Sequence, residues 1–265
     1  MKHSRTLATL FAAVAATAAI AGCSSSSTDE DATPTSAADS AAVSGDLTVF
    51  AAASLKSTFT ELGDMFEDAH PGTSVTFNFA GSSDLVAQLQ QGAPADVFAS
   101  ADTANMTKAQ DLVAGTPVNF ATNTLTIVTP PGNPAQITSF ADLAKPDVQV
   151  VVCAPQVPCG AATAKVEAAT NVTLSPVSEE SSVTDVLGKV TSGQADAGLV
   201  YVTDAATAGD KVTAVPFPES AGAVNTYPIA ALTDAGNPEA AEAFVALVTG
   251  PEGRKVLAEA GFAAP

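Results

Sequence analysis

Apolar residues fall into short unbroken runs that alternate with stretches of helical spacing. Leu55, Phe59, Leu62 and Phe66 recur at helical spacing directly after the first such run. Runs without polar alternation are typical of strands buried on both faces. The predicted strands are "DLTVFAAA" (46–53), "SVTFNFA" (74–80), "ADVFASA" (95–101), "NTLTIVTP" (123–130), "VQVVVCAP" (148–155), "ADAGLVYV" (195–202), "KVTAVPF" (211–217) and "TYPIAAL" (226–232). This alternation predicts an α/β fold with mainly parallel sheets and helices on their faces.

The first 45 residues follow a different pattern. Lys2 and Arg5 precede an apolar run that ends in small residues, which predicts a signal peptide over residues 1–22. "IAGC" resembles a bacterial lipobox, whose cysteine, here Cys23, becomes the lipidated N-terminus; an ordinary signal peptide cut near Ala21 is the alternative. Residues 23–45 carry too few large apolar side chains to form a core, so we expect a disordered tether. The predicted location is extracytoplasmic, with the lipid anchored in the outer face of the cell membrane.

Composition narrows the function classes for residues 46–265, which suffice for one large domain or two small ones. The whole chain has a net charge of −18; loss of Lys2 and Arg5 leaves 8 basic and 28 acidic residues, a net charge of −20. Nucleic-acid binding needs basic stripes and is excluded. With His70 as the last histidine and no catalytic or phosphate-binding motif, we expect no enzyme, no cofactor and no direct metal-cation ligands.

Two junctions between a predicted strand and helix suggest where a ligand binds. "FAAASLK" and "FAGSSDL" each pass through small residues and present a serine, Ser54 or Ser82, at a helix start. Free N–H groups and the helix dipole make such a start an anion site, and the hydroxyl adds a donor. The alternative is that both serines are plain helix N-caps.

At this point a family resemblance can be stated. "LTVFAAASLK", "FNFAGSSDL", "GAPADVFASAD", "VPCGAATAK", "GLVYVTDA", "YPIAAL" and "GPEGRKVLAEAGF" occur in the order and spacing seen in molybdate-binding proteins of bacterial ABC importers. The resemblance covers nearly all of residues 47–262. It implies a two-lobed periplasmic-binding-protein fold with two crossover connections, one lobe from 46–122 plus 225–265 and the other from 123–224.

The resemblance also implies a binding site made of neutral donors from both lobes. Ser54 and Ser82 would supply hydroxyl and main-chain N–H groups, Cys159 and Val183 main-chain N–H groups, and Tyr201 its phenolic hydroxyl. The ligand would be molybdate, and tungstate as well. The protein, expected to be a monomer, would deliver it to an ABC permease.

Other functions stay open at this point. The site could bind another oxyanion such as sulfate, or a small organic anion, although an organic acid normally needs an arginine and the mature chain has only Arg254. An enzyme with Cys159 as nucleophile would need a base, and His70 lies in a predicted helix exit. A structural lipoprotein would leave the paired serine junctions unexplained.

Cys153 and Cys159 are the two thiols left once Cys23 is lipidated. Their spacing fits neither a C-x-x-C redox motif nor a zinc knuckle. Outside the cytoplasm an isolated pair favours a disulfide, which we predict here. Two free thiols too far apart to bridge are the alternative.

Overall fold

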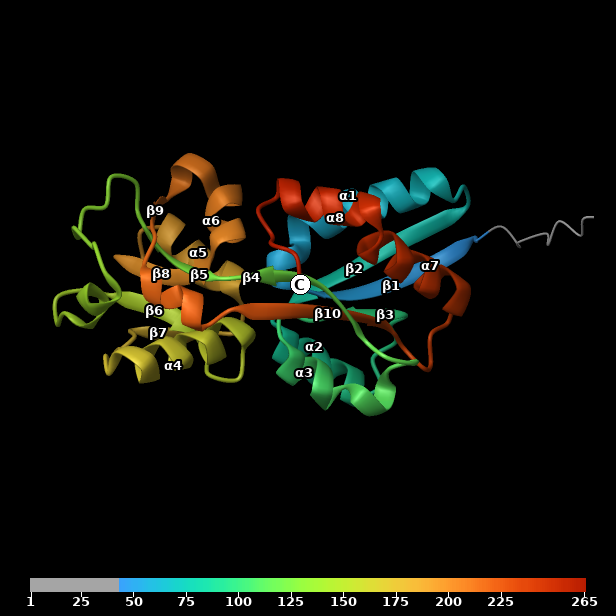
Figure 1. Cartoon of the computed structure of the whole chain (residues 1–265), viewed down its shortest axis with the longest axis horizontal. Helices are drawn as coiled ribbons and strands as arrows, with labels where there is room; N and C mark the ends of the chain where they lie inside the picture. The colour runs from blue at the N-terminus through green and yellow to red at the C-terminus, as the bar shows by residue number, and fades with distance from the viewer. Residues whose placement is uncertain (1–42) are drawn as a thin grey trace, which may run out of the picture. The chain divides into compact units, whose positions relative to one another are not determined.

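The computed structural model describes residues 43–265 (Figure 1). The predicted signal peptide, Cys23 and nearly all of the predicted tether lie outside the described residues. The first strand begins at Gly45, which the sequence placed at the end of the tether. Within residues 43–265, no helix combines the length and the hydropathy needed to cross a membrane.

The strands form two five-stranded sheets. Sheet 1 has the order β2-β1-β3-β10-β4 and sheet 2 the order β7-β6-β8-β5-β9. The strands of sheet 1 are β1 (Gly45–Ala52), β2 (Thr73–Ala80), β3 (Val97–Ala99), β4 (Val118–Asn123) and β10 (Asn225–Ala231). Those of sheet 2 are β5 (Leu125–Thr129), β6 (Val150–Cys153), β7 (Ser178–Glu180), β8 (Ala197–Tyr201) and β9 (Thr213–Val215).

Helices cover both faces of each sheet. On sheet 1, α1 (Lys56–Ala69), α7 (Pro238–Thr249) and α8 (Pro251–Glu259) lie on one face, and α2 (Ser82–Gln90) and α3 (Thr103–Lys108) on the other (Figure 1). On sheet 2, α5 (Val183–Thr191) and α6 (Val202–Ala208) lie opposite α4 (Pro158–Thr170). Short 3₁₀ helices are η1 (Ala53–Leu55), η2 (Gln110–Leu112), η3 (Phe140–Ala144), η4 (Gly209–Lys211) and η5 (Pro218–Gly222). Each sheet with its helices forms one lobe, so the predicted two-lobed α/β fold is confirmed.

The sheets are mainly parallel, as predicted, with one reversed strand in each. In sheet 1, β1 is parallel to β2 and β3, whereas β10 is antiparallel to β3 and β4. In sheet 2, β6 is parallel to β7 and β8, whereas β5 is antiparallel to β8 and β9. The reversed strands are β5 and β10, each of which is the first strand after the chain passes from one sheet to the other. They do not belong to β-α-β units, so the parallel rule does not apply to them.

The apolar spacing of the helices explains how they dock. In α1, Phe59, Leu62 and Phe66 are buried, and Phe244 of α7 packs its ring 5.9 Å from Phe59 and 5.5 Å from Phe66. These residues belong to one continuous core under sheet 1, while α2 and α3 bury a second cluster on the other face. One further cluster holds lobe 2 together. The cores fix the strand ends from which the site is built.

Two strands and one α-helix were not predicted, nor were the short helices η4 and η5. Strand β4 reads "VNFATN", with its first two residues exposed, so it lacks the continuous apolar run of a central strand. Strand β7 is only three residues long and contains two glutamates. Helix α6 follows β8 without a break, and its sequence was read partly as the end of that strand.

Candidate functional site

A small cavity lies where helix starts of lobe 1 face helix starts of lobe 2. Residues from both lobes line it, and they include all five predicted site residues. The lining consists of Ala52, Ala53, Ser54, Gly81, Ser82, Ala101, Val157, Pro158, Cys159, Val183 and Tyr201. Among these described residues none has a charged side chain, so donors rather than counter-charges define the cavity.

Ser54 lies in η1, directly after β1. It is not a helix N-cap, because Ala52 caps η1 and Leu55 caps α1, neither with a side-chain hydrogen bond. The Ser54 Oγ instead lies 3.1 Å from the Tyr227 Oη, where either atom can donate. The alternative interpretation of Ser54 as a plain N-cap is therefore wrong. Ser54 lines the cavity, and its hydroxyl pairs with that of Tyr227.

Ser82 is the first residue of α2, and Gly81 holds the N-cap position. The Ser82 Oγ accepts a hydrogen bond of 3.0 Å from the Ala101 N–H. Ser82 is 1% exposed, so water cannot substitute for this contact. Since the oxygen accepts from the backbone, its own hydrogen is left to donate. The main-chain N–H of a first helical residue also has no intrahelical partner.

Helix α4 brings Cys159 to the cavity from lobe 2. Val157 is the N-cap, Pro158 occupies the first helical position, and Cys159 follows as the second. Proline suits that first position because the N–H it lacks would have no helical partner. The Cys159 sulfur forms a disulfide with Cys153 at the end of β6, with 5.6 Å between the two Cα atoms. The predicted pairing is thus present, and it joins the strand end to the helix start.

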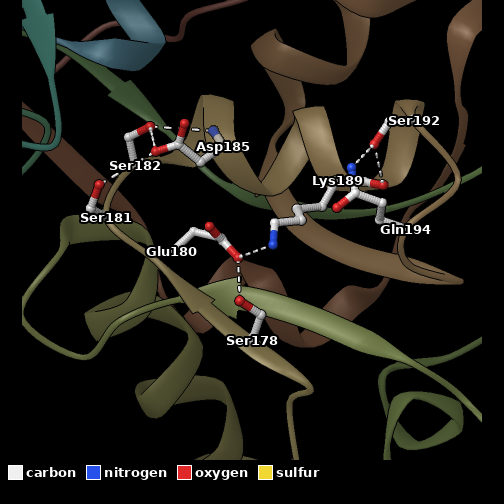
Figure 2. A network of polar contacts seen from close by, with 8 residues as sticks. All are labelled: Ser178, Glu180, Ser181, Ser182, Asp185, Lys189, Ser192 and Gln194. Carbon is white, nitrogen blue, oxygen red and sulfur yellow. Dashed lines mark hydrogen bonds and ion pairs between the residues drawn. The ribbon is translucent and has the colours of Figure 1, made fainter.

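Helix α5 starts at Val183, and a network of polar contacts fixes that start (Figure 2). The Ser182 Oγ accepts from the Asp185 N–H at 3.3 Å and donates to the Asp185 carboxylate at 2.7 Å. Further along, Lys189 forms an ion pair of 3.5 Å with Glu180 of β7. Val183, which is buried, therefore presents its main-chain N–H from a well-anchored turn.

Tyr201 ends β8 and is 1% exposed. Its Oη is buried and has no hydrogen-bond partner among the described residues, although it belongs to the cavity lining. Burial chiefly, with the neighbouring Tyr227 and the negative charge of Asp204, raises the pKa of Tyr201 well above its usual value. The phenol stays protonated and is a donor without an acceptor.

Asp204 and Tyr227 contact residues that line the cavity, and neither was predicted from the sequence. Asp204 is 6% exposed and accepts a hydrogen bond of 3.0 Å from the Tyr201 N–H. Burial raises its pKa from the ordinary 3.8 to about 7, and the bond from Tyr201 only partly opposes this. The Tyr227 ring lies 6.0 Å from the Tyr201 ring. An acidic residue three positions after the strand-ending tyrosine was a readable signal for Asp204, whereas nothing local distinguishes Tyr227 from a core tyrosine.

The fold and this cavity define a class of protein. Two α/β lobes that present helix starts to a shared cavity form a two-lobed binding protein rather than a structural one. The chain belongs to the bacterial extracellular solute-binding protein family, whose profile matches residues 47–263. This is a family of binding proteins, which agrees with the expectation that the chain is not an enzyme and carries no cofactor.

Individual proteins similar to this chain include molybdate-binding proteins and a lipoprotein. The molybdate-binding protein ModA of Mycobacterium tuberculosis is 58% identical over 221 residues, covering 83% of this chain and 85% of the relative. A putative ABC transporter substrate-binding lipoprotein of Bacillus subtilis, YvgL, is 30% identical over 264 residues and 96% of each chain. The solved periplasmic molybdate-binding protein of Azotobacter vinelandii has the same fold, with a TM-score of 0.71 at 23% identity over 83% of this chain and 99% of that one.

Proposed function

We propose that this protein captures molybdate, and tungstate with it, outside the cytoplasm and delivers the anion to an ABC permease. The lobes would comprise residues 46–122 with 225–265, and residues 123–224. The ligand would lie in the cavity between them. The 58% identity to a protein named for molybdate binding supports the choice of ligand.

One observation carries the proposal, the buried Tyr201 hydroxyl that lines an uncharged cavity without a partner. A buried donor without an acceptor is costly, so a ligand oxygen is its natural partner. Ser54 and Ser82 would donate from lobe 1 through hydroxyl and N–H groups. Cys159 and Val183 would donate main-chain N–H groups at the starts of α4 and α5, where the helix dipole favours an anion.

A donor-only site would select for a fully deprotonated oxyanion. Main-chain N–H groups offer no acceptor to the hydroxyl of hydrogen phosphate, and the Ser82 oxygen already accepts from the Ala101 N–H, so that hydroxyl would be poorly paired. Net charge gives no help, because a mature chain at −20 repels anions at long range. Affinity must therefore come from donors that both lobes bring to the ligand, and binding would favour the closed arrangement of the lobes.

Membrane attachment through Cys23 is part of the proposal. The related lipoprotein of Bacillus subtilis matches 96% of this chain, which supports a lipidated form here. The Cys23→Ser variant should move the protein from the membrane fraction into the soluble extracytoplasmic fraction. A variant that stays with the membrane in the same fractionation would exclude the anchor.

Calorimetry and thermal unfolding of residues 43–265 with molybdate, tungstate, sulfate and phosphate test the proposed ligand. A ligand that binds the native state at 100 times its Kd adds about 2.7 kcal/mol of stability. We expect such a gain with molybdate and tungstate and none with phosphate. Flat responses to molybdate and tungstate would reject the proposal, and a response to sulfate alone would favour the sulfate alternative.

A further inference from the structure

Gly81 lies at the point where the two lobes touch beside the cavity. Its backbone has φ −59° and ψ 139°, a conformation that any residue can adopt. A methyl group on its Cα, however, would overlap the carbonyl oxygen of Ser181 in lobe 2 and come within 3.5 Å of the Val157 side chain. Glycine is required here for space between the lobes and not for backbone freedom.

The carbonyl of Ser181 cannot easily move aside. Ser181 immediately precedes the N-cap Ser182, and its own hydroxyl lies 3.4 Å from the Asp185 carboxylate (Figure 2). Asp185 also holds Ser182, so a shift of the Ser181 carbonyl would disturb the first turn of α5. The surface that Gly81 meets is therefore anchored in lobe 2.

We infer that Gly81 sets how closely the lobes approach and thereby determines whether the donors of both lobes can reach one anion. This inference rests on the proposed function. Ser82, the lobe 1 donor, directly follows Gly81, and Val183, a lobe 2 donor, lies two residues after Ser181. The contact between Gly81 and Ser181 thus fixes the distance between the two donor sets. A side chain at position 81 holds the lobes apart and leaves each lobe intact.

The Gly81→Ala variant tests this inference against two other glycines. Gly188, in the middle of α5, has nothing within 4 Å of its Cβ position, so Gly188→Ala is the matched control. A methyl group at Gly160 would overlap the carbonyl oxygen of Ala154 within lobe 2. Gly160→Ala therefore shows how far a clash inside one lobe lowers the unfolding temperature of the unliganded protein. All variants are compared with the unsubstituted protein by thermal unfolding, molybdate calorimetry and small-angle X-ray scattering.

Without ligand, we expect Gly81→Ala to unfold at the same temperature as the unsubstituted protein. It should bind molybdate about tenfold more weakly or worse. Its radius of gyration, measured by X-ray scattering, should not decrease when molybdate is added. Gly188→Ala should bind and contract normally. Three results would overturn the inference: unchanged affinity, normal contraction at saturating molybdate, or an unliganded stability loss matching that of Gly160→Ala. If the unsubstituted protein bound neither molybdate nor tungstate, the proposed function itself would fall, so the two failures are distinguishable.

Discussion

Asp204 makes the stability of the unliganded protein depend on pH in a direction unusual for a carboxylate. Its pKa in the folded protein is about 7, against 3.8 as the ordinary value, because the side chain is buried. The unfolded chain releases this proton more readily than the folded one. The stabilising effect of the protonated group is complete below pH 3.8 and is lost as the pH rises through 7.

The size of the effect follows from the shift. Each unit of pKa difference corresponds to about 1.4 kcal/mol, so a shift of about three units gives a loss of about 4 kcal/mol between pH 4 and pH 8. The Asp204→Asn variant removes the titration and retains an oxygen that can accept the Tyr201 N–H. The free energy of unfolding of Asp204→Asn should exceed that of the unsubstituted protein by an amount that grows with pH. This difference should level off above pH 7, at about 4 kcal/mol.

Urea unfolding of ligand-free protein at one-unit steps from pH 4 to pH 8 measures this difference. Asp210→Asn, which removes an exposed carboxylate just beyond α6, controls for the loss of one charge. Its curve should run parallel to that of the unsubstituted protein. If the Asp204→Asn curve were also parallel, the burial argument for Asp204 would be wrong.

Three further predictions concern the proposed donors. Tyr201→Phe should weaken molybdate binding by about 1.5–3 kcal/mol, as for a hydrogen bond to a charged group, without lowering unliganded stability, because the lost hydroxyl has no protein partner; equal affinity in calorimetry would remove Tyr201 from the site. Ser82→Ala should weaken binding and also cost about 1–3 kcal/mol of stability, because the Ala101 N–H loses its acceptor; calorimetry and unfolding read the two effects separately, and loss of stability alone would make Ser82 purely structural. Reducing the Cys153–Cys159 disulfide should lower stability by about 2–3 kcal/mol and weaken molybdate binding, because the bond fixes the start of α4; affinity unchanged in reductant would separate the bond from the site.

The strand-to-helix junctions could be predicted because they depend on local pattern. Buried strands read as apolar runs, and small residues with a serine mark the turn into a helix. Ser54 and Ser82 were found in this way, although neither is an N-cap in the structure. Capping is decided by one turn of backbone geometry, and the sequence places helix starts only to within a few residues.

Cys159, Val183 and Tyr201 came from the family resemblance and not from local pattern. A main-chain donor leaves no trace in residue type, so Val183 could not be found from physical chemistry alone. Tyr227 was missed for a related reason, since its contact with Ser54 joins residues 173 positions apart. Such contacts depend on how the sheets assemble, which the order of elements along the chain does not determine.

The strand order of sheet 1 has a consequence for how the chain folds. β10 lies between β3 and β4, so β4 has no neighbouring strand in its sheet until residues 225–231 arrive. All five strands of sheet 2, in contrast, lie within residues 125–215. Lobe 2 can therefore be completed before the last part of the chain is available, and β1 can already pair with β2 and β3, whereas β4 must wait for β10. Pairing between strands so far apart in the sequence is slow, so we expect the pairing of β10 with β3 and β4 to limit the folding rate. A chain truncated before β10 should still form sheet 2 but should not complete sheet 1.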